Sequence, residues 1–300
     1  MSSEPEEHLV TDEGDAAGPP PVMEDGADAD ALRAVPSLLA DMPFGAHVGT
    51  FVHGVFEATD FAAADLEAEL GRRIDEVQAR RAIDIGDRGV VLTGLSAVIE
   101  TPLGPLLGGA RLRDVARADR LDELDFELPL AGGDIPSGRV DLAAIGGVLR
   151  DDPDLASYAE RLEDPALRSR FRGYLTGSVD LVVRRGDRFA VVDYKTNWLG
   201  APGEDLSAWH HRPAVLAAEM RRSHYVLQAL LYTVVLHRFL RWRMPGYDPE
   251  RNLGGVLYLF LRGMVGPATP VIGDTPCGVF SWRPSAALVT RLSDVLDGRG

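Results

Sequence analysis

Cysteine is nearly absent from this sequence, in which Cys277 is the single one among 300 residues. A lone cysteine excludes an internal disulfide and any site built from several thiolates. No stretch approaches the roughly 20 consecutive apolar residues that cross a bilayer, and the first residues are acidic where a signal peptide would be basic. We therefore expect a soluble, cytoplasmic protein with no membrane partner.

The chain also lacks the G-x-x-x-x-G-K-[ST] loop that binds nucleotide phosphates, so it has no ATPase motif and no motor of its own. An excess of basic residues is missing too, because the net charge is −15 at pH 7. That charge argues at first sight against a nucleic-acid partner, since DNA binding neutralises phosphates with Lys and Arg. However, ten carboxylates and one Arg fall within residues 1–34, which carry −9 and leave only −6 for the rest.

Arginines gather in several places along that remaining part of the chain. The clusters are Arg168, Arg170 and Arg172; Arg184, Arg185 and Arg188; Arg221 and Arg222; and Arg238, Arg241 and Arg243. Each cluster is compatible with phosphate contacts and equally with ordinary solvated side chains, so both interpretations stay open.

The composition divides the chain into two parts. Residues 1–34 combine acids, Ala, Gly and a run of three prolines with almost no large apolar residue. Such a segment cannot bury enough surface to offset its ordering entropy, so we predict a disordered acidic tail or linker. Residues 35–300 have a globular pattern and are predicted to form one main domain.

Periodicity indicates strands that alternate with helices. Apolar residues recur at helical spacing in these segments: 50–59, 63–82, most of 86–118, 139–149, 154–164, 166–173 and a long helix at 213–242 that ends before Pro245. Besides a hairpin described next, strands are predicted at 121–130, 254–261 and 279–282, and a last helix begins at Pro284. This order favours an α/β fold with a central mixed sheet flanked by helices.

The most informative part of the chain is a predicted hairpin. Two β-rich runs, 178–184 and 188–195, flank a Gly-Asp turn at 186–187. Counting outward from this turn pairs Asp180 with Asp193, whose Cβ atoms would then lie about 4.5–5.5 Å apart. Because strand side chains alternate between faces, Lys195 lies on the same side as Asp193. We therefore predict that Asp180, Asp193 and Lys195 form one cluster.

Two opposed carboxylates repel each other unless a cation neutralises them. Both strands are otherwise apolar on both faces, which is typical of buried strands and argues against two idle solvent-facing acids. Carboxylate ligands completed by water suit Mg²⁺. Such an ion polarises a phosphate oxygen and lowers the pKa of bound water, while Lys195 positions that water or stabilises charge on the phosphoryl group. Asp180, Asp193 and Lys195 are thus the predicted catalytic residues.

The same residues carry a family resemblance. The sequence G-S-V-D at 177–180, followed by V-D-Y-K-T-N at 192–197, resembles the G-x-x-D and D-x-K signature of the PD-(D/E)xK nucleases. The longer run D-Y-K-T-N-W-L-G at 193–200 is similar to the RecB version of that signature, and the likeness extends over about 49–290. The resemblance implies a restriction-endonuclease-like core and a Mg²⁺-dependent DNA exonuclease, which acts with a helicase in double-strand-break processing and recombinational repair.

The resemblance also implies a set of metal ligands. The segment 49–57 resembles the family's histidine-bearing helix, so His53 would join Asp180, Asp193 and the main-chain carbonyl of Tyr194 around the ion. Glu57 lies one turn further along the same helix face and is a supporting candidate. A histidine ligand makes the site somewhat softer, so that Mn²⁺ or Ca²⁺ would also bind.

Further supporting residues follow from two other motifs. Tyr225, Gln228 and Tyr232 resemble the Y-x-x-Q-x-x-x-Y motif that supports the active site of RecB-like nucleases, and by spacing alone they are also compatible with a polar edge. Glu123 lies in R-x-x-E-x-x-F at 120–126, which resembles the family's motif on the first core strand. It is expected either near the metal or in contact with an arginine.

The implied partners are DNA, single-stranded at the active site, a helicase motor in the same or another chain, and the gamma and alpha subunits of exonuclease V. RecB itself begins with a helicase motor, whose phosphate loop this chain lacks. One alternative keeps the fold without catalysis, as a DNA-binding or subunit-interaction module. Another is a different nuclease of the same fold, although iron–sulfur versions need four Cys ligands and are excluded.

Overall fold

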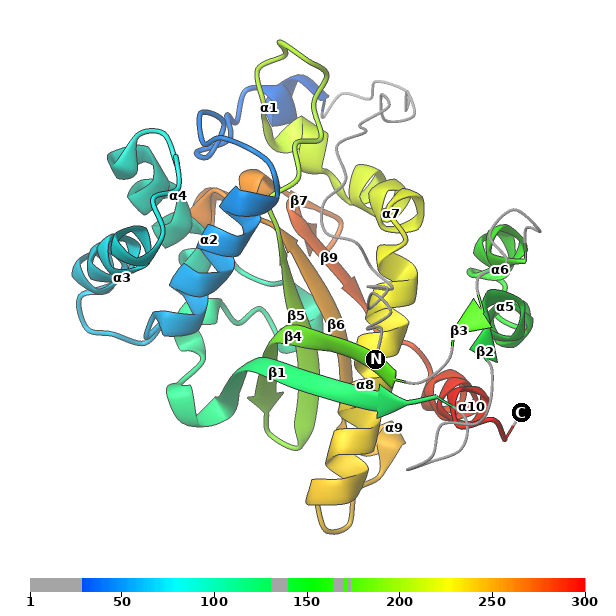
Figure 1. Cartoon of the computed structure of the whole chain (residues 1–300). Helices are drawn as coiled ribbons and strands as arrows, with labels where there is room; N and C mark the ends of the chain where they lie inside the picture. The colour runs from blue at the N-terminus through cyan, green and yellow to red at the C-terminus, as the bar shows by residue number, and fades with distance from the viewer. Residues whose placement is uncertain (1–28, 131–139, 164–169, 172–173, 300) are drawn as a thin grey trace, which may run out of the picture.

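A mixed sheet of five strands forms the centre of the molecule in the computed structural model, which describes residues 29–130, 140–163, 170–171 and 174–299 (Figure 1). The strand order is β1-β4-β5-β6-β9, where β5 and β6 are parallel and the other neighbours antiparallel. The strands are β1 (Arg120–Pro129), β4 (Tyr174–Arg185), β5 (Arg188–Lys195), β6 (Leu253–Phe260) and β9 (Val279–Trp282). The predicted mixed sheet is confirmed.

Helices cover both faces of this sheet (Figure 1). On one face lie α2 (Ala46–Ala58), α3 (Leu66–Arg80) and α4 (Arg88–Glu100), and on the other lie α8 (Tyr225–Arg243) and α10 (Ala286–Leu296). The sheet residues Leu181, Val192 and Leu257 join the first core, whereas Val182, Val191 and Val256 join the second. Since β4, β5 and β6 are apolar on both faces, the sheet is buried between two helical layers.

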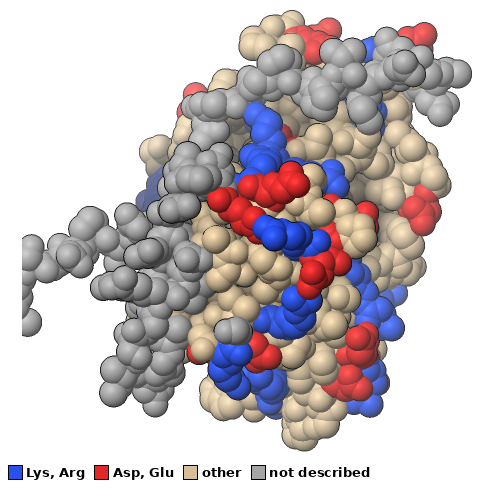
Figure 2. Space-filling view, turned by 90° about the vertical axis from the view of Figure 1, so that its right-hand side faces the viewer, with Lys and Arg blue, Asp and Glu red and all other residues tan. Residues whose placement is uncertain are grey.

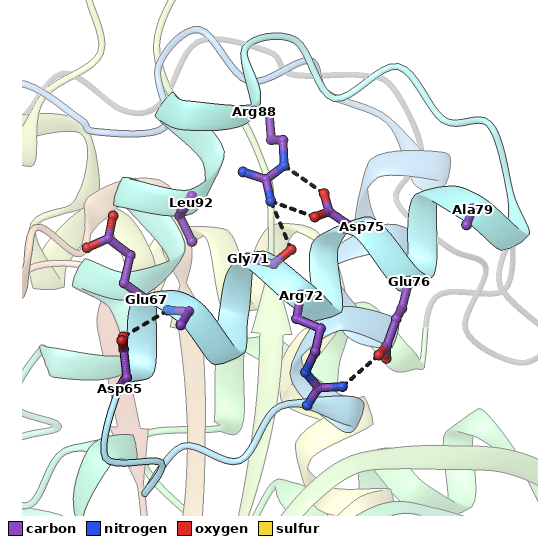
Figure 3. Close-up of a pocket in the computed structure, with 10 residues that line it drawn as sticks. Asp65, Glu67, Gly71, Arg72, Asp75, Glu76, Ala79, Arg88 and Leu92 are labelled. Carbon is purple, nitrogen blue, oxygen red and sulfur yellow. Dashed lines mark hydrogen bonds and ion pairs between the residues drawn. The ribbon is translucent and has the colours of Figure 1, made fainter.

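The outer surface of α3 and α4 is a polar face held by ion pairs (Figure 3). The Arg88 guanidinium on α4 donates to both carboxylate oxygens of Asp75 and to the carbonyl of Gly71 on α3. Along α3, Arg72 bridges to Glu76. A groove of about 800 Å³ runs along these pairs. The Arg88–Asp75 pair joins the two helices, and Arg72 pairs with Glu76 within α3, so we do not consider this groove the functional site.

The long helix predicted over 213–242 is instead two helices. Helix α7 (Pro213–Arg222) ends at Ser223, and α8 begins at Tyr225 after His224 adopts a left-handed backbone with φ of 57°. The His224 ring lies within 3.0 Å of the hydroxyl of Tyr158 on α6 (Ala156–Leu162). The prediction of one continuous helix was wrong because this local tertiary contact, invisible in the periodicity, accompanies a change of direction.

Other differences lie at the margins of the sheet. A helix was predicted over 166–173, but Arg170–Phe171 form strand β3, which pairs with β2 (Val140–Asp141), so the prediction is wrong there. Residues 164–169 and 172–173 lie outside the described residues. Helix α5 (Leu142–Leu149) follows β2 directly. After α4, the mostly helical stretch contains three short 3₁₀ turns, Pro105–Leu107, Leu112–Asp114 and Arg117–Asp119. The remaining short elements are α9 (Pro249–Asn252), β7 (Val271–Ile272), β8 (Thr275–Pro276) and the 3₁₀ turns Ala208–His211, Leu261–Gly263 and Gly266–Ala268.

The folded part of the chain begins before residue 35. Residues 1–28 lie outside the described part, but Ala29–Arg33 form helix α1. The prediction of a disordered tail to residue 34 is therefore wrong for these five residues. Leu32 is buried against Ala208 and Cys277, and the Arg33 guanidinium lies 4.4 Å from the centre of the Trp209 ring. Composition alone missed these contacts because their partners are distant in sequence.

Within the described residues, no single helix is long and apolar enough to cross a bilayer. Only α4 combined with 105–114, across a bend of 61°, passes a test of length and composition.

Candidate active site

The hairpin between β4 and β5 opens at the predicted catalytic residues. Its ladder runs from Arg185 paired with Arg188 to Leu181 paired with Val192, which confirms the predicted register. Beyond that point β4 continues beside β1, and β5 continues beside β6 to Lys195 (Figure 1). The expected direct pairing of Asp180 with Asp193 therefore lies just beyond the end of the ladder, where the two strands separate.

An irregularity in β1 and β4 coincides with this separation. Glu123 has a left-handed backbone with φ of 49°, and the ladder passes from Asp122–Leu181 to Leu124–Val179 without it. Residues two apart on a regular strand share one face, yet Val179 and Leu181 belong to the cores on opposite sides of the sheet. Distortions of this kind redirect side chains and concentrate at functional sites. Here the distortion lies beside Asp180.

A cavity of about 930 Å³ lies where the strands separate. It is lined by all the site residues expected from the sequence: His53, Glu57, Glu123, Asp180, Asp193, Tyr194, Lys195, Tyr225, Gln228 and Tyr232. They come from α2, β1, β4, β5 and α8, elements that are far apart along the chain. The fold thus brings every predicted site residue to one place.

Asp193 and Lys195 form a buried ion pair on the floor of this cavity. Lys195 Nζ lies 2.9 Å from Asp193 Oδ2, and the side chains are only 9% and 2% exposed. Burial lowers the pKa of Lys195, but Asp193, Tyr225 and Asp180 together outweigh burial and leave the pKa raised. Burial raises the pKa of Asp193 to about 7, with Lys195 opposing and Asp180 adding to that rise. Lys195 is the only lysine in the chain, whose other basic residues are all arginines.

His53, Asp180 and Tyr194 form a second, adjoining network. The Tyr194 main-chain N–H donates to Asp180 Oδ2 at 2.9 Å, while His53 Nδ1 lies 3.3 Å from Asp180 Oδ1. The other ring nitrogen, Nε2, lies 3.1 Å from the Tyr194 carbonyl oxygen. Both ring nitrogens thus face oxygen acceptors, an arrangement that a doubly protonated imidazole satisfies.

The pKa values in this network follow from its charges. Burial lowers the pKa of His53, but the Asp180 carboxylate outweighs burial and raises the pKa to about 9. Burial acts to raise the pKa of Asp180, yet His53 and Lys195 outweigh it and hold the pKa below its usual value. Protons on His53 and Lys195 therefore offset the negative charge of Asp180, and that of Asp193 when Asp193 is ionised.

These donors suit a divalent cation. Two carboxylates, one main-chain carbonyl and one imidazole offer mostly hard oxygen with one nitrogen, a set compatible with Mg²⁺ or Mn²⁺. In the described part of the chain, however, no three His, Cys, Asp or Glu side chains already converge as a formed cage. The Asp193 carboxylate is paired with Lys195. The His53 ring contacts the Asp180 carboxylate and the Tyr194 carbonyl. The chemistry of the donor groups thus fits a cation, although in this structure the donor side chains make ion pairs and hydrogen bonds with their neighbours.

The raised pKa of His53 predicts how stability depends on pH. In metal-free protein its stabilising contribution is complete below the unfolded value of about 6.5 and is lost as the pH rises to about 9. The free energy of unfolding in EDTA should therefore fall across this window. Urea denaturation at several pH values measures it, and His53→Gln should flatten the slope. Because cation ligands must be deprotonated, Mn²⁺ added in place of EDTA should restore stability most at the alkaline end of this pH window. An effect of Mn²⁺ that does not depend on pH would contradict the role of His53 as a ligand.

Tyr225 of α8 lies beside the lysine. The Tyr225 ring centre lies 4.3 Å from Lys195 Nζ, and the Tyr225 hydroxyl accepts a hydrogen bond from Asn197 Nδ2 at 3.1 Å. Gln228 Nε2 donates to the Tyr232 hydroxyl at 3.1 Å. The three residues predicted from helical spacing therefore do lie along one side of the cavity, where Tyr225 contributes a cation–π contact.

Tyr258 belongs to the same arrangement but was missed in the sequence. It is fully buried on β6, opposite Asp193 in the parallel ladder, and its hydroxyl donates to Gln228 Oε1 at 3.0 Å. Its ring centre lies 5.6 Å from Lys195 Nζ. A tyrosine within an otherwise apolar strand was the available signal, but the register between two parallel strands cannot be counted from a turn.

Glu57 and Glu123 pair with each other at the outer side of the cavity. The Glu57 side chain is mostly exposed, and burial together with the neighbouring Glu123 carboxylate raises its pKa. Of the two expectations for Glu123, the structure thus favours a place in the cavity, beside another carboxylate.

The arginine clusters do not form a broad basic surface on the face drawn in Figure 2, where basic and acidic side chains interleave. Several of these arginines are paired with acids: Arg184 with Asp119, Arg222 with Glu219 and Arg238 with Asp297. Arg168 and Arg172 lie outside the described residues. Two other arginines, Arg80 and Arg81, line the cavity itself.

Comparison with known proteins agrees with this geometry. A model of the PD-(D/E)XK nuclease superfamily matches residues 30–271. The RecBCD enzyme subunit RecB of Mycolicibacterium smegmatis is 48% identical over 304 residues, which cover 99% of this chain and 27% of that protein. The subunit RecB of Mycobacterium tuberculosis is 49% identical over 279 residues, covering 87% of this chain and 24% of that protein.

A more distant relative is the RecBCD enzyme subunit RecB of Escherichia coli, which is 33% identical over 262 residues, covering 85% of this chain and 19% of that protein. The chain therefore spans about a quarter or less of the length of these relatives. The family model, by contrast, matches most of the chain, over a range that contains His53, Asp180, Asp193 and Lys195. By this match and by its five-stranded mixed sheet, the chain belongs to the PD-(D/E)XK nuclease superfamily.

Proposed function

We propose that this chain is a metal-dependent DNA nuclease, an exonuclease that hydrolyses phosphodiester bonds in double-strand-break processing and recombinational repair. One observation carries the proposal: the buried Asp193 carboxylate, the largely buried Asp180 carboxylate and the single lysine line one cavity at the separation of β4 and β5. Buried like charges are costly unless they serve a cation or a reaction. Membership of a nuclease superfamily and the similarity to RecB support the same activity.

The cation would be held by His53, Asp180, Asp193 and the carbonyl of Tyr194. Mg²⁺ is the proposed ion. Mn²⁺ would also bind because one donor is an imidazole nitrogen, and Ca²⁺ would also bind because the other donors are oxygens. When bound, the ion polarises a phosphate oxygen and lowers the pKa of a coordinated water. Deprotonation of His53 and Asp193 must accompany binding, since a protonated donor cannot ligate.

Lys195 supplies a positive charge at a fixed position. Its ammonium group is held between the Asp193 carboxylate and the Tyr225 ring, so little reorganisation is needed when negative charge develops on the phosphoryl group. Asp193 holds the proton on Lys195 by raising its pKa. Tyr258 and Gln228 are positioning residues, because their hydrogen bond joins β6 to α8 behind the lysine.

The proposal is tested with the purified chain and a labelled single-stranded oligonucleotide. Fragments are expected with Mg²⁺ or Mn²⁺ and none in EDTA. A circular single strand of the same sequence distinguishes an exonuclease from an endonuclease, because an exonuclease needs a strand end and leaves the circle intact. A catalytically silent binding module would retain the oligonucleotide without producing fragments at any Mg²⁺ or Mn²⁺ concentration, and that result would refute the proposal.

The proposed partners follow from the relatives rather than from a surface of this chain. The relatives are named as subunits of RecBCD enzyme. We infer a helicase motor in the same or another chain, together with the gamma and alpha subunits of exonuclease V. The implied location is the cytoplasm, where the DNA substrate lies.

A further inference from the structure

An aromatic pair lies next to the candidate active site and takes no part in the chemistry described so far. Phe44 and Trp198 have ring centres 6.4 Å apart and ring planes inclined by 47°. Phe44 is 60% exposed, the second most exposed of the large apolar side chains described, and Trp198 is half-buried. Exposing a phenylalanine to this extent forgoes most of the stabilisation that its burial would give. The pair thus presents aromatic surface to solvent.

A buried arginine fixes the two segments that carry this pair. The Arg262 guanidinium is 1% exposed, and its Nε donates to the Thr196 carbonyl at 2.8 Å, two residues before Trp198. The same group donates to the carbonyls of Met42 and Pro43, at 2.9 and 2.7 Å, immediately before Phe44. The two chain segments are therefore joined through one planar cation, which makes the aromatic pair a preorganised feature rather than two independent exposed rings.

Both segments lead directly out of the candidate active site. Trp198 follows Lys195 by three residues, a reach of about 10 Å at most. Phe44 precedes α2, whose first turns contribute Gly49 and Thr50 to the lining of the cavity. In Figure 1 the start of α2 lies beside the end of β5. A strand held at the cavity would pass the aromatic pair within a few nucleotides.

We propose that Phe44 and Trp198 form a stacking platform for a nucleobase of the single-stranded DNA that enters or leaves the active site. The inference rests on the proposed nuclease function and adds a substrate-binding subsite to it. Every base has a π-face, so aromatic side chains bind single strands without regard to sequence. Such a subsite would matter in a chain of net charge −15, which has little general attraction for phosphates. Rigid rings also lose little conformational entropy on binding.

The test compares two probes that carry the same phosphates. Fluorescence anisotropy at low salt in EDTA measures binding of the full chain to a labelled thymidine 12-mer and to an abasic 12-mer. Phe44→Ala and Trp198→Ala should each weaken binding of the thymidine strand by roughly 5- to 150-fold. Binding of the abasic strand should not change. Phe44→Tyr and Trp198→Phe should retain most of the affinity, because a ring remains.

Trp242→Ala is the matched control, because Trp242 is 76% exposed near the end of α8, outside the cavity lining, and should leave both affinities unchanged. Thermal melting checks that the variants are folded. If Trp198→Ala unfolds, Phe44→Ala alone tests the platform, because Phe44 is already exposed and its loss should not disturb the fold. The platform is refuted if the alanine variants bind the thymidine strand like wild type, or if they weaken both probes equally.

The platform and the nuclease function can fail separately. Metal-dependent cleavage by the wild type, with thymidine-strand affinity unaltered in both alanine variants, would refute the platform and leave the nuclease standing. Base-dependent loss of affinity in those variants, with no cleavage by the wild type at any metal concentration, would leave the platform standing and refute the nuclease.

Discussion

Replacement of Asp193 by Asn is expected to lower the rate of DNA cleavage by about 10³-fold or more. The substitution keeps the size of the side chain but removes a carboxylate ligand, and a bound cation contributes several kcal/mol of charge stabilisation in the transition state. Each 1.36 kcal/mol corresponds to a tenfold change in rate. The rate should be measured in single-turnover experiments with protein in excess over a labelled single strand, at saturating Mg²⁺, so that weak DNA binding does not obscure the chemical step.

A matched Asp→Asn control is available in the same hairpin. Asp187 lies in the exposed turn between β4 and β5, and Asp187→Asn should cleave DNA at the wild-type rate. Isothermal titration with Mn²⁺ provides a readout besides activity, since Asp193→Asn should bind the ion more weakly. Wild-type cleavage by Asp193→Asn would show that the site is misassigned.

Replacement of Lys195 by Met should reduce cleavage by about 10²- to 10³-fold, the usual effect of removing one preorganised group that stabilises developing charge. Methionine retains the length of the apolar stem, so the packing against Tyr225 and Tyr258 is largely kept. Lys195→Arg should not rescue activity, because the enclosed site accommodates a compact ammonium and a guanidinium is larger and planar. The same single-turnover assay measures both variants.

The single lysine allows this assignment to be tested without activity. Protein labelled with ¹³C only at lysine Cε should give one side-chain signal, whose titration reports the pKa of Lys195. We expect a pKa above the usual value of about 10.4, because Asp193, Tyr225 and Asp180 together outweigh the effect of burial. Asp193→Asn removes the largest of these three effects, so the pKa of Lys195 should fall below its wild-type value. An ordinary pKa that is unchanged in Asp193→Asn would show that the buried ion pair does not exist in solution.

Local rules were sufficient for the hairpin and its register. A Gly-containing turn between two β-rich runs sets the pairing, and the ladder from Arg185 to Leu181 follows the count outward from that turn. Helical spacing likewise placed Tyr225, Gln228 and Tyr232 on one side of α8, where all three line the cavity. These features depend on neighbours in sequence, so a single chain is enough to infer them.

Other features depend on segments that are distant in the chain. The break at His224 accompanies a contact with Tyr158, and the place of Tyr258 opposite Asp193 depends on a parallel register that no turn specifies. The position of α1 depends on Ala208 and Cys277. None of these partners lies within the window over which periodicity or turn chemistry acts, and therefore none was predicted.

The sequence by itself determined that two acids and a lysine would gather on one hairpin, because turn geometry and side-chain alternation are local. Only the tertiary structure decided that the hairpin opens at Asp180, because that opening arises where β4 follows β1 and β5 follows β6. It also decided that His53 reaches the Tyr194 carbonyl, since packing of α2 on the sheet sets that distance. Local preferences determine which chemical groups lie together on the hairpin, and long-range packing arranges them around a cavity.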